Sequence, residues 1–186
     1  MRIIAIAAAV VALLIFRLST YAAAPKTLVT GTLAAAGAAA QPGDVLELQA
    51  RVYDEAHVEI TRAGTAAQPI TLRGAGVAQS ILSGRITFRP GAAYWIIEDL
   101  AVDMTGEAKE DAIRANPDVH HLTFRRLHVH NGSMYGIRLE NGVADVLIEQ
   151  CDIGHFVNSG TDAHGIGLQV VSNVTVRGCY LHHNSG

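Results

Sequence analysis

The stretches DVLIEQCDI at residues 145–153 and NVTVRGCYL at residues 173–181 follow one pattern of polar, apolar and charged positions, with cysteine in seventh place. Two earlier stretches, YWIIEDLAV at residues 94–102 and HLTFRRLHV at residues 121–129, align with them without a gap. The four stretches start 27, 24 and 28 residues apart, so the chain contains a sequence repeat.

Short strands separated by turns make up each repeat. A second pattern recurs between the first ones, as DAIRAN at residues 111–116, YGIRLEN at 135–141 and HGIGLQV at 164–170, and no helical period follows the apolar N-terminus. Repeats of this length built from short strands indicate a solenoid, because a propeller blade needs about 40 residues. We therefore predict an all-β fold, a parallel β-helix of about six coils over residues 42–186, stacked about 4.8 Å apart.

Stacking of the coils places equivalent residues of the repeat in columns. One apolar column is expected in the core and comprises Ile97, Phe124, Ile148 and Val176. The outward column beside it alternates in charge and comprises Glu98, Arg125, Glu149 and Arg177. Asp99 and Arg126 form a further opposite pair, and such cross-strand pairs stabilise by roughly 0.2 to 1 kcal/mol each. This alternation supports the alignment.

The two cysteines, Cys151 and Cys179, fall in a second inward column after Leu100 and Leu127. We expect them to act as small apolar residues with free, buried thiols. Stacked side chains on neighbouring coils are poorly placed for disulfide geometry, although an exported protein could oxidise them. A disulfide and a metal site are the alternatives to two free thiols.

The N-terminus has the features of a signal peptide. Arg2 is followed by 14 apolar residues, Ile3–Phe16, a run shorter than the about 20 that span a membrane. We predict a signal peptide at residues 1–24 and a secreted or periplasmic protein, with an uncleaved membrane anchor as the alternative. Residues 25–41 are expected to lead into the first coil.

Composition narrows the class of protein. The 186 residues are 49% hydrophobic and 17% charged, with a formal net charge of −3, which suffices for one domain with a substantial core. Nucleic-acid-binding proteins usually show a basic patch or stripe, which this balance does not suggest. We expect a monomer that does not bind nucleic acid. Because Lys26 and Lys109 are the only lysines, little lysine-based chemistry is expected.

The run QPGDVLELQARVYDEAHVEITRAGTAAQPITLRGAG at residues 41–76 resembles the first coils of secreted right-handed parallel β-helix proteins of the pectin-lyase-like superfamily. The similar features are a PGD turn, a tyrosine at a strand end and a GTxxxPITLR coil. The stretch AYWIIEDL at residues 93–100 is similar to the next coil, and the resemblance extends over residues 42–186. It implies that the coils are right-handed.

The resemblance also implies an exported, carbohydrate-active protein that binds a polysaccharide, often an acidic one, in a groove along the coils. Lyases of this kind remove a proton next to a uronate carboxylate with a base, while arginine, lysine or calcium neutralises the carboxylate. We expect β-elimination of an acidic polysaccharide. The alternatives are a non-catalytic carbohydrate-binding or structural envelope β-helix and a glycoside hydrolase on the same scaffold.

Two arginines are candidates for binding the uronate carboxylate. Arg114 and Arg138 occupy the same outward position on neighbouring coils, where two like charges destabilise unless an anion lies nearby. Guanidinium groups bind carboxylates through paired hydrogen bonds, so the two could clamp the substrate, with Glu140 on the same face as part of this site. Local pairing with Glu140, Asp111 or Glu110 is the alternative.

The stretch SGTDAHGIGL at residues 159–168 follows the longest insertion among the aligned coils and is the candidate catalytic segment. His164 aligns in a column with Tyr135, and either side chain could remove the proton. Asp162 is expected to orient that base or to bind calcium. The alternatives are a turn role for His164 and an Asx-turn at Asp162.

The nine histidines raise the question of a metal site. His155 and His183 share one column on adjacent coils, and His130 and His182 share another column two coils apart. Positions two coils apart are separated by about 10 Å, too far for one ion. We interpret these histidines as a stacked polar ladder and predict no metal ligands among them.

Calcium is the one cofactor that remains an alternative. Asp162, Asp152 and Glu140 are the acidic residues that could hold it, although no run of acidic residues marks such a site.

The sequence ends with LHHNSG at residues 181–186, directly after an expected strand. A solenoid needs a cap on each end, because an uncapped end exposes unpaired strand edges and the core. We therefore expect these residues to be the N-terminal part of a longer protein, with C-terminal coils and a cap missing.

Overall fold

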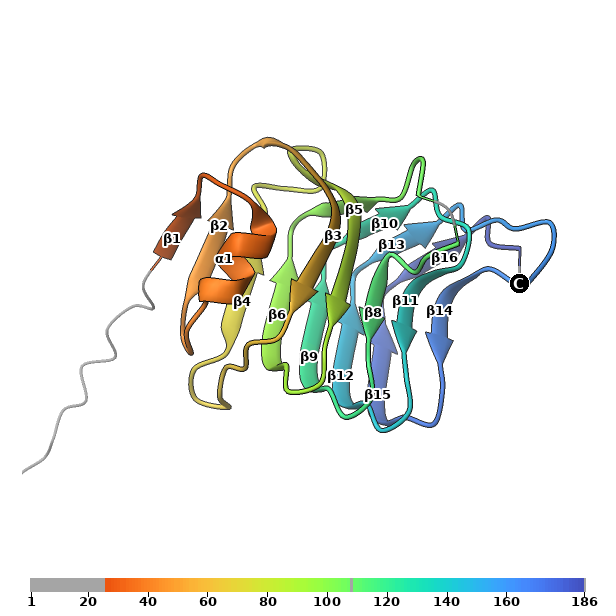
Figure 1. The fold of residues 1–186 in the computed structure, drawn as a ribbon. Coiled ribbons are helices and arrows are strands. Elements are labelled where there is room, and N and C mark those ends of the chain that lie inside the picture. The colour runs from red at the N-terminus through yellow and green to blue at the C-terminus, as the bar shows by residue number, and fades with distance from the viewer. Residues whose placement is uncertain (1–25, 108, 186) are drawn as a thin grey trace, which may run out of the picture.

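The computed structural model describes residues 26–107 and 109–185, which form a parallel β-solenoid (Figure 1). The predicted signal peptide at residues 1–24 lies outside the described residues. The all-β, parallel β-helix fold predicted from the repeats is confirmed, with about five turns against the about six coils expected. Within the described residues, no helix is long and apolar enough to cross a membrane.

Strands from successive turns of the solenoid, together with β1 at its N-terminal end, form a seven-stranded parallel sheet, called sheet A. Its strands, in spatial order, are β1 (Lys26–Val29), β2 (Val45–Leu48), β4 (Ile70–Arg73), β6 (Ala93–Glu98), β9 (His120–Arg125), β12 (Ala144–Glu149) and β15 (Ser172–Arg177). Sheet A therefore begins at β1, inside the segment that was expected only to lead into the first coil.

The second sheet has nine strands and consists of two ladders joined by the long strand β5 (Ser80–Phe88), which also pairs with β3 (Arg51–Ile60). The first half of β5 pairs with β7 and its second half with β8. The β7 ladder comprises β7 (Ala101–Asp103), β10 (His128–His130), β13 (Asp152–Gly154) and β16 (Tyr180–His182). The β8 ladder comprises β8 (Ile113–Ala115), β11 (Tyr135–Leu139) and β14 (His164–Leu168).

The strand register agrees with the predicted columns. Glu98, Arg125, Glu149 and Arg177 are successive partners in sheet A. Arg177 lies 2.7 Å from Glu149, and the predicted pair of Asp99 and Arg126 is joined at 2.6 Å. The alternating charge ladder on the outside of sheet A is therefore confirmed.

The predicted core column is also confirmed. Ile97, Phe124 and Ile148 are fully buried, whereas Val176 is 42% exposed because β15 is the last strand of sheet A among the described residues. Cys151 is buried and Cys179 half-buried, and both thiols are free, as predicted. Burial raises the pKa of the Cys151 thiol to about 12.

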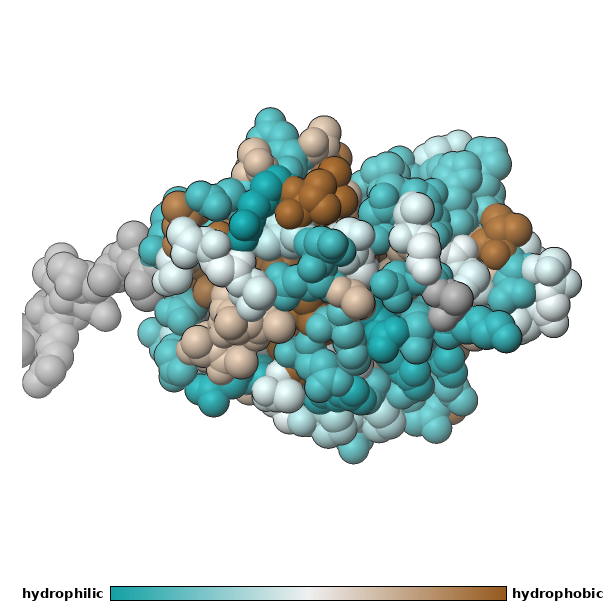
Figure 2. Space-filling view, turned by 45° about the horizontal axis from the view of Figure 1, so that its top comes forward, coloured by the Kyte–Doolittle hydropathy of each residue, from teal (hydrophilic) through white to brown (hydrophobic). Residues whose placement is uncertain are grey.

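Hydrophilic residues cover most of the face seen in Figure 2, and the hydrophobic residues on it form small, separate patches. The core is therefore enclosed between the ladders, as a solenoid requires.

The second residue of each of the last four strands of sheet A has a left-handed backbone conformation. This column has φ values of 56°, 56°, 56° and 50° and comprises Tyr94, His121, Asp145 and Asn173. Non-glycine residues seldom adopt this conformation, and asparagine and aspartate tolerate it best. The bend places four successive side chains along one edge of sheet A.

The helix α1 (Leu33–Ala39) was not predicted, and the expectation that no helix follows the N-terminal segment is wrong. Thr32 caps it by accepting a hydrogen bond from the Ala35 amide, and the Glu55 carboxylate of β3 accepts from the Leu33 and Ala34 amides. A helix of seven residues is not stable alone in water. Burial of Leu33 and these contacts with β3 therefore stabilise it at the N-terminal end of the solenoid (Figure 1).

Candidate functional site

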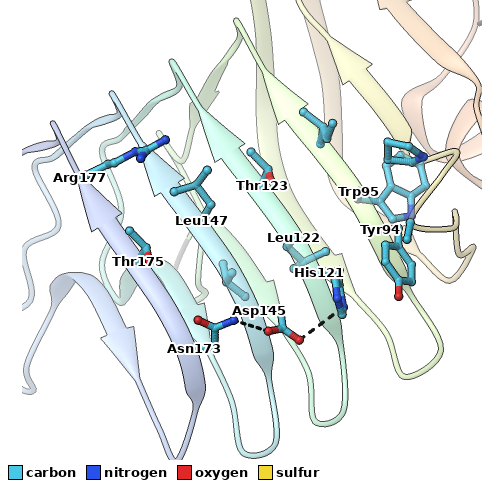
Figure 3. A pocket seen from close by; sticks show the side chains of 14 residues that line it. Tyr94, Trp95, His121, Leu122, Thr123, Asp145, Leu147, Asn173, Thr175 and Arg177 are labelled. Atoms are coloured by element: carbon cyan, nitrogen blue, oxygen red, sulfur yellow. Dashed lines mark hydrogen bonds and ion pairs between the residues drawn. The ribbon is translucent and has the colours of Figure 1, made fainter.

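Two surfaces carry the features expected of a site: a groove over sheet A, and a charged surface on the β8 ladder that we call the arginine face. The groove has a volume of about 610 Å³ and crosses β6, β9, β12 and β15 (Figure 3). Uncharged side chains form its floor, namely Ile96, Thr123, Leu147 and Thr175. Its length across successive coils suits an extended ligand.

One edge of the groove is the column of left-handed residues at the strand starts. The Asn173 amide donates to the Asp145 carboxylate at 2.5 Å, and Asp145 lies 3.6 Å from Nδ1 of His121. The rings of His121 and Tyr94 stack with centroids 4.3 Å apart. Figure 3 shows this row along the ends of the strands. It offers an aromatic face, hydrogen-bond donors and a carboxylate to a polar ligand.

The charge ladder is the other edge of the groove, where Arg177 is labelled in Figure 3. Behind it, Glu98 is buried and accepts hydrogen bonds from Arg73, Arg125 and Arg126. Burial alone would raise the pKa of Glu98, but the hydrogen bonds from Arg73 and Arg125 hold it below its usual value. These charges are paired with one another, so this edge shapes the groove rather than supplying free positive charge.

None of the predicted site residues lines the groove. The sequence signal for it was present, because Tyr94, His121, Asp145 and Asn173 are the first residues of the four aligned stretches. The alignment alone does not predict the groove edge, because it does not show that the backbone at these positions has positive φ.

The arginine face brings three predicted residues together. Tyr135 and His164 are register partners on β11 and β14, and their rings stack with centroids 5.3 Å apart. The guanidinium carbon of Arg138 lies 5.0 Å from the centroid of the Tyr135 ring. The Tyr135 ring therefore lies between the His164 ring and a cation.

The predicted pairing of Arg114 with Arg138 across neighbouring coils is confirmed by the register of β8 and β11. Arg114 forms an ion pair with Glu140, and Arg138 lies 3.8 Å from both Glu140 and Asp111. The local pairing considered as the alternative is therefore present. Binding of a substrate carboxylate by these arginines stays a prediction.

Asp111 is the buried residue beneath this arrangement, and it was not among the predicted site residues. Its carboxylate is 4% exposed and accepts a hydrogen bond from the Tyr135 amide at 3.2 Å. Burial raises the pKa of Asp111, although the Arg138 charge opposes this shift. Asp111 thus anchors Tyr135 and Arg138 together, and its column position beside Tyr135 could have indicated this role.

A small hollow of about 170 Å³ adjoins Arg114 on the arginine face. Its wall includes Arg85, which pairs with Glu110 at 3.0 Å, and His57, which is hydrogen-bonded to Thr87. Burial and the Arg85 charge lower the pKa of His57. Nε of Arg114 is buried here and has no hydrogen-bond partner among the described residues. The hollow is lined by groups that can donate to an anion.

Asp162 lies apart from these groups. It is exposed and makes no hydrogen bond or ion pair within the described part of the chain. Asp152 lies in β13, Glu140 directly follows β11, and Asp162 lies in the loop before β14. Binding of calcium by these residues stays a prediction.

Residues 111–186 match the model of a protein family described as the right-handed β-helix region. With the sheet topology, this identifies a right-handed parallel β-helix of the pectin-lyase-like fold, in agreement with the sequence resemblance. No curated protein matches the chain in sequence.

Several solved structures share the fold. An alginate lyase from Paenibacillus sp. str. FPU-7 matches with a TM-score of 0.63 and 22% identity over 77% of this chain and 54% of that one. Pectate lyase Pel9A matches with a TM-score of 0.66 and 18% identity over 79% and 41%. The PL6 family alginate lyase AlyGC matches with a TM-score of 0.58 and 18% identity over 77% and 21%.

At these identities the similarity shows the fold alone. The chain spans about half of the length of the first lyase and less of the other two. This chain therefore shares its fold with these lyases.

Proposed function

We propose that this chain belongs to an exported protein that cleaves an acidic polysaccharide by β-elimination at the arginine face. The observation that carries the proposal is the contact of Tyr135 with both His164 and Arg138. The polysaccharide-lyase scaffold supports the substrate class, and the apolar run at residues 3–16 supports export.

In this reaction Tyr135 or His164 accepts the proton next to the uronate carboxylate. The electron pair of that C–H bond first moves toward the carboxylate, which gives an enolate-like intermediate with extra negative charge on the carboxylate. That electron pair then forms the new carbon–carbon double bond as the glycosidic C–O bond breaks, and the departing oxygen takes up a proton. Arg138 would stabilise that charge through hydrogen bonds from its guanidinium.

The neighbouring residues have positioning roles in this proposal. Asp111 and Glu140 hold Arg138 from two sides, at 3.8 Å each. Arg114 is the second arginine that binds the substrate carboxylate. When the polysaccharide binds, Arg114 leaves its ion pair with Glu140 and pairs with that carboxylate instead. Asp162 would contribute only after its loop moves toward His164.

The test is incubation of the full chain with alginate, pectate and other uronate polymers, with detection of unsaturated uronate ends by ultraviolet absorbance. Arg138→Ala should lose most of the activity, whereas Arg177→Ala, a matched arginine at the groove edge, should retain it. Equal loss in both variants, or full activity in Arg138→Ala, would contradict the proposed site. New reducing ends without unsaturation would indicate a hydrolase instead.

The groove over sheet A favours a second candidate, a carbohydrate-binding β-helix without catalysis. Its floor is uncharged and its edge offers the Tyr94 ring and the amide of Asn173. Binding of uronate oligosaccharides with no new unsaturated or reducing ends would favour this function. Loss of that binding in Tyr94→Ala, but not in Tyr135→Ala, would locate it in the groove.

A further inference from the structure

We propose that His155, His182 and His183 form a binding site for a divalent transition-metal ion such as zinc. The potential ligand atoms of the three side chains lie within 4.8 Å of one another. None of the three residues lines the groove or contacts Tyr135, so the proposal is independent of the proposed function. These histidines were expected to form a stacked polar ladder, and their geometry leads us to revise that interpretation.

The fold brings the three histidines together at the end of the β7 ladder. β13 and β16 pair in register, with Gly154 opposite His182, so His155 and His183 follow their strands at equivalent positions. Both adopt positive φ, 61° and 52°, and their rings stack with centroids 4.8 Å apart. The His182 ring is nearly perpendicular to both, at 88° and 89°.

A carboxylate fixes the orientation of the most buried ring. Asp152 accepts a hydrogen bond from Nε2 of His182 at 2.8 Å, so the proton is on Nε2 and the lone pair is on Nδ1. That lone pair points toward Nδ1 of His183, 2.7 Å away. A carboxylate behind a ligating histidine is the usual outer-shell arrangement of protein metal sites, because it sets the tautomer and raises ligand basicity.

Small ring rotations bring the three nitrogens to bonding distance of one ion. Nitrogens around a tetrahedral zinc lie about 3.4 Å from each other, given Zn–N bonds of about 2.0–2.1 Å. The rings of His155 and His183 are exposed and can turn, while His182 is held by Asp152.

The donor set selects the class of ion. Three neutral imidazoles favour zinc, nickel, copper or cobalt, whereas calcium and magnesium prefer oxygen ligands. This chemistry differs from the calcium alternative considered for the acidic residues.

Gly154 supports the arrangement by leaving room for the His182 ring. A Cβ at position 154 would lie 2.4 Å from Cε1 and 2.6 Å from Nε2 of His182. Gly154→Ala must therefore displace the ring from its bond with Asp152, although the backbone conformation at this position is open to alanine. This variant removes the ligand geometry without removing a ligand.

The chain contains an internal control for the site. His120 and His121 form an equivalent pair, also with Nδ1 atoms 2.7 Å apart. Their neighbours are Tyr94 and Asp145, and no third histidine joins them. If adjacent histidines alone sufficed, this pair would bind the ion equally well.

The experiment is a titration of the full chain, purified without a histidine tag, with Zn²⁺ by calorimetry and with Co²⁺ by visible absorbance. We expect one ion per chain, at least about tenfold weaker binding in His155→Ala and in His183→Ala, and about 10- to 100-fold weaker binding in Asp152→Asn. Gly154→Ala should weaken binding similarly, and His121→Ala should bind as the unmodified chain does.

Thermal melting of each variant checks that the fold is intact, and the exposed positions of His155 and His183 make this the expected result. Absence of Zn²⁺ binding by the unmodified chain would overturn the proposal. So would unchanged affinity in folded His155→Ala and His183→Ala, or a loss in His121→Ala equal to theirs.

Discussion

The groove over sheet A and the arginine face on the β8 ladder are built by the same coils, yet they carry different kinds of side chain. The groove floor is uncharged, and its charged residues sit at its edges with partners, as Arg177 does with Glu149 and Asp145 with His121. On the arginine face, Arg138 lies 3.8 Å from its acidic partners and beside the Tyr135 ring, which stacks on His164. The first surface is suited to shape recognition and the second to reaction, and this difference can be tested.

The largest expected effect is a loss of elimination rate, which distinguishes the two candidate bases, Tyr135 and His164. If Tyr135 removes the proton, Tyr135→Phe should lower the rate of unsaturated-end formation by about 10² to 10⁴-fold, because a general base contributes about that much. His164→Ala should then have a smaller effect, and the reverse holds if His164 is the base. Initial rates at saturating substrate measure the difference, with Tyr94→Phe in the groove as the matched control. A full rate in both variants would remove the arginine face from the reaction.

The free energy of unfolding should distinguish charged residues that stabilise the fold from charged residues that belong to a site. Glu98 is 1% exposed with three arginine partners, so Glu98→Gln should lower the free energy of unfolding by about 3 kcal/mol. Glu140 is 14% exposed, and Glu140→Gln should lower it by only about 1 kcal/mol. Urea unfolding of both variants gives the comparison, and a larger loss for Glu140 would mean that the arginine face is mainly structural.

A substitution in the groove should change the affinity for an oligosaccharide rather than the rate of elimination. Stacking on an aromatic ring contributes about 1 kcal/mol, so Tyr94→Ala should weaken the binding of a uronate oligosaccharide by about fivefold. The rate of elimination at saturating substrate should be unchanged. Calorimetry and the absorbance assay measure the two quantities. A fall in rate without a fall in affinity would place the chemistry in the groove.

The smallest expected effect is a difference in pH dependence between the two surfaces. The pKa of Glu98 is held below its usual value, so its stabilising contribution is present above the unfolded pKa near 4.5 and is lost as the pH falls through the folded pKa. The pKa of Asp111 is raised by burial, so its contribution is present below about 3.8 and is lost as the pH rises through the folded pKa.

The destabilisation caused by Glu98→Gln should therefore shrink as the pH is lowered below about 4.5, toward the folded pKa of Glu98. The effect of Asp111→Asn should change in the opposite direction over the acidic range. Thermal melts of both variants at several pH values measure this, and parallel pH profiles would contradict the assigned shifts.

Much of the arginine face could be predicted from the sequence, because stacked coils convert spacing along the chain into contact in space. The alignment of Tyr135 with His164, and of Arg114 with Arg138, follows from the repeat once the strands are placed. The distances of Arg138 from Asp111 and Glu140 could not be predicted in the same way. They depend on side-chain rotamers and on the burial of Asp111, which the aligned sequence does not specify.

The sequence by itself determined the parallel β-helix, the register of its coils, the core columns and the alternating charges, because each of these repeats at a nearly constant spacing. The tertiary structure alone decided three other features. The helix α1 forms because Glu55 of β3 binds its first amides. The edge of the groove forms where Tyr94 and its column adopt positive φ. The three histidines converge because Gly154 leaves room for the His182 ring. Each depends on a backbone conformation or a side-chain contact that the aligned sequence does not specify, and such contacts exist only after the coils have stacked.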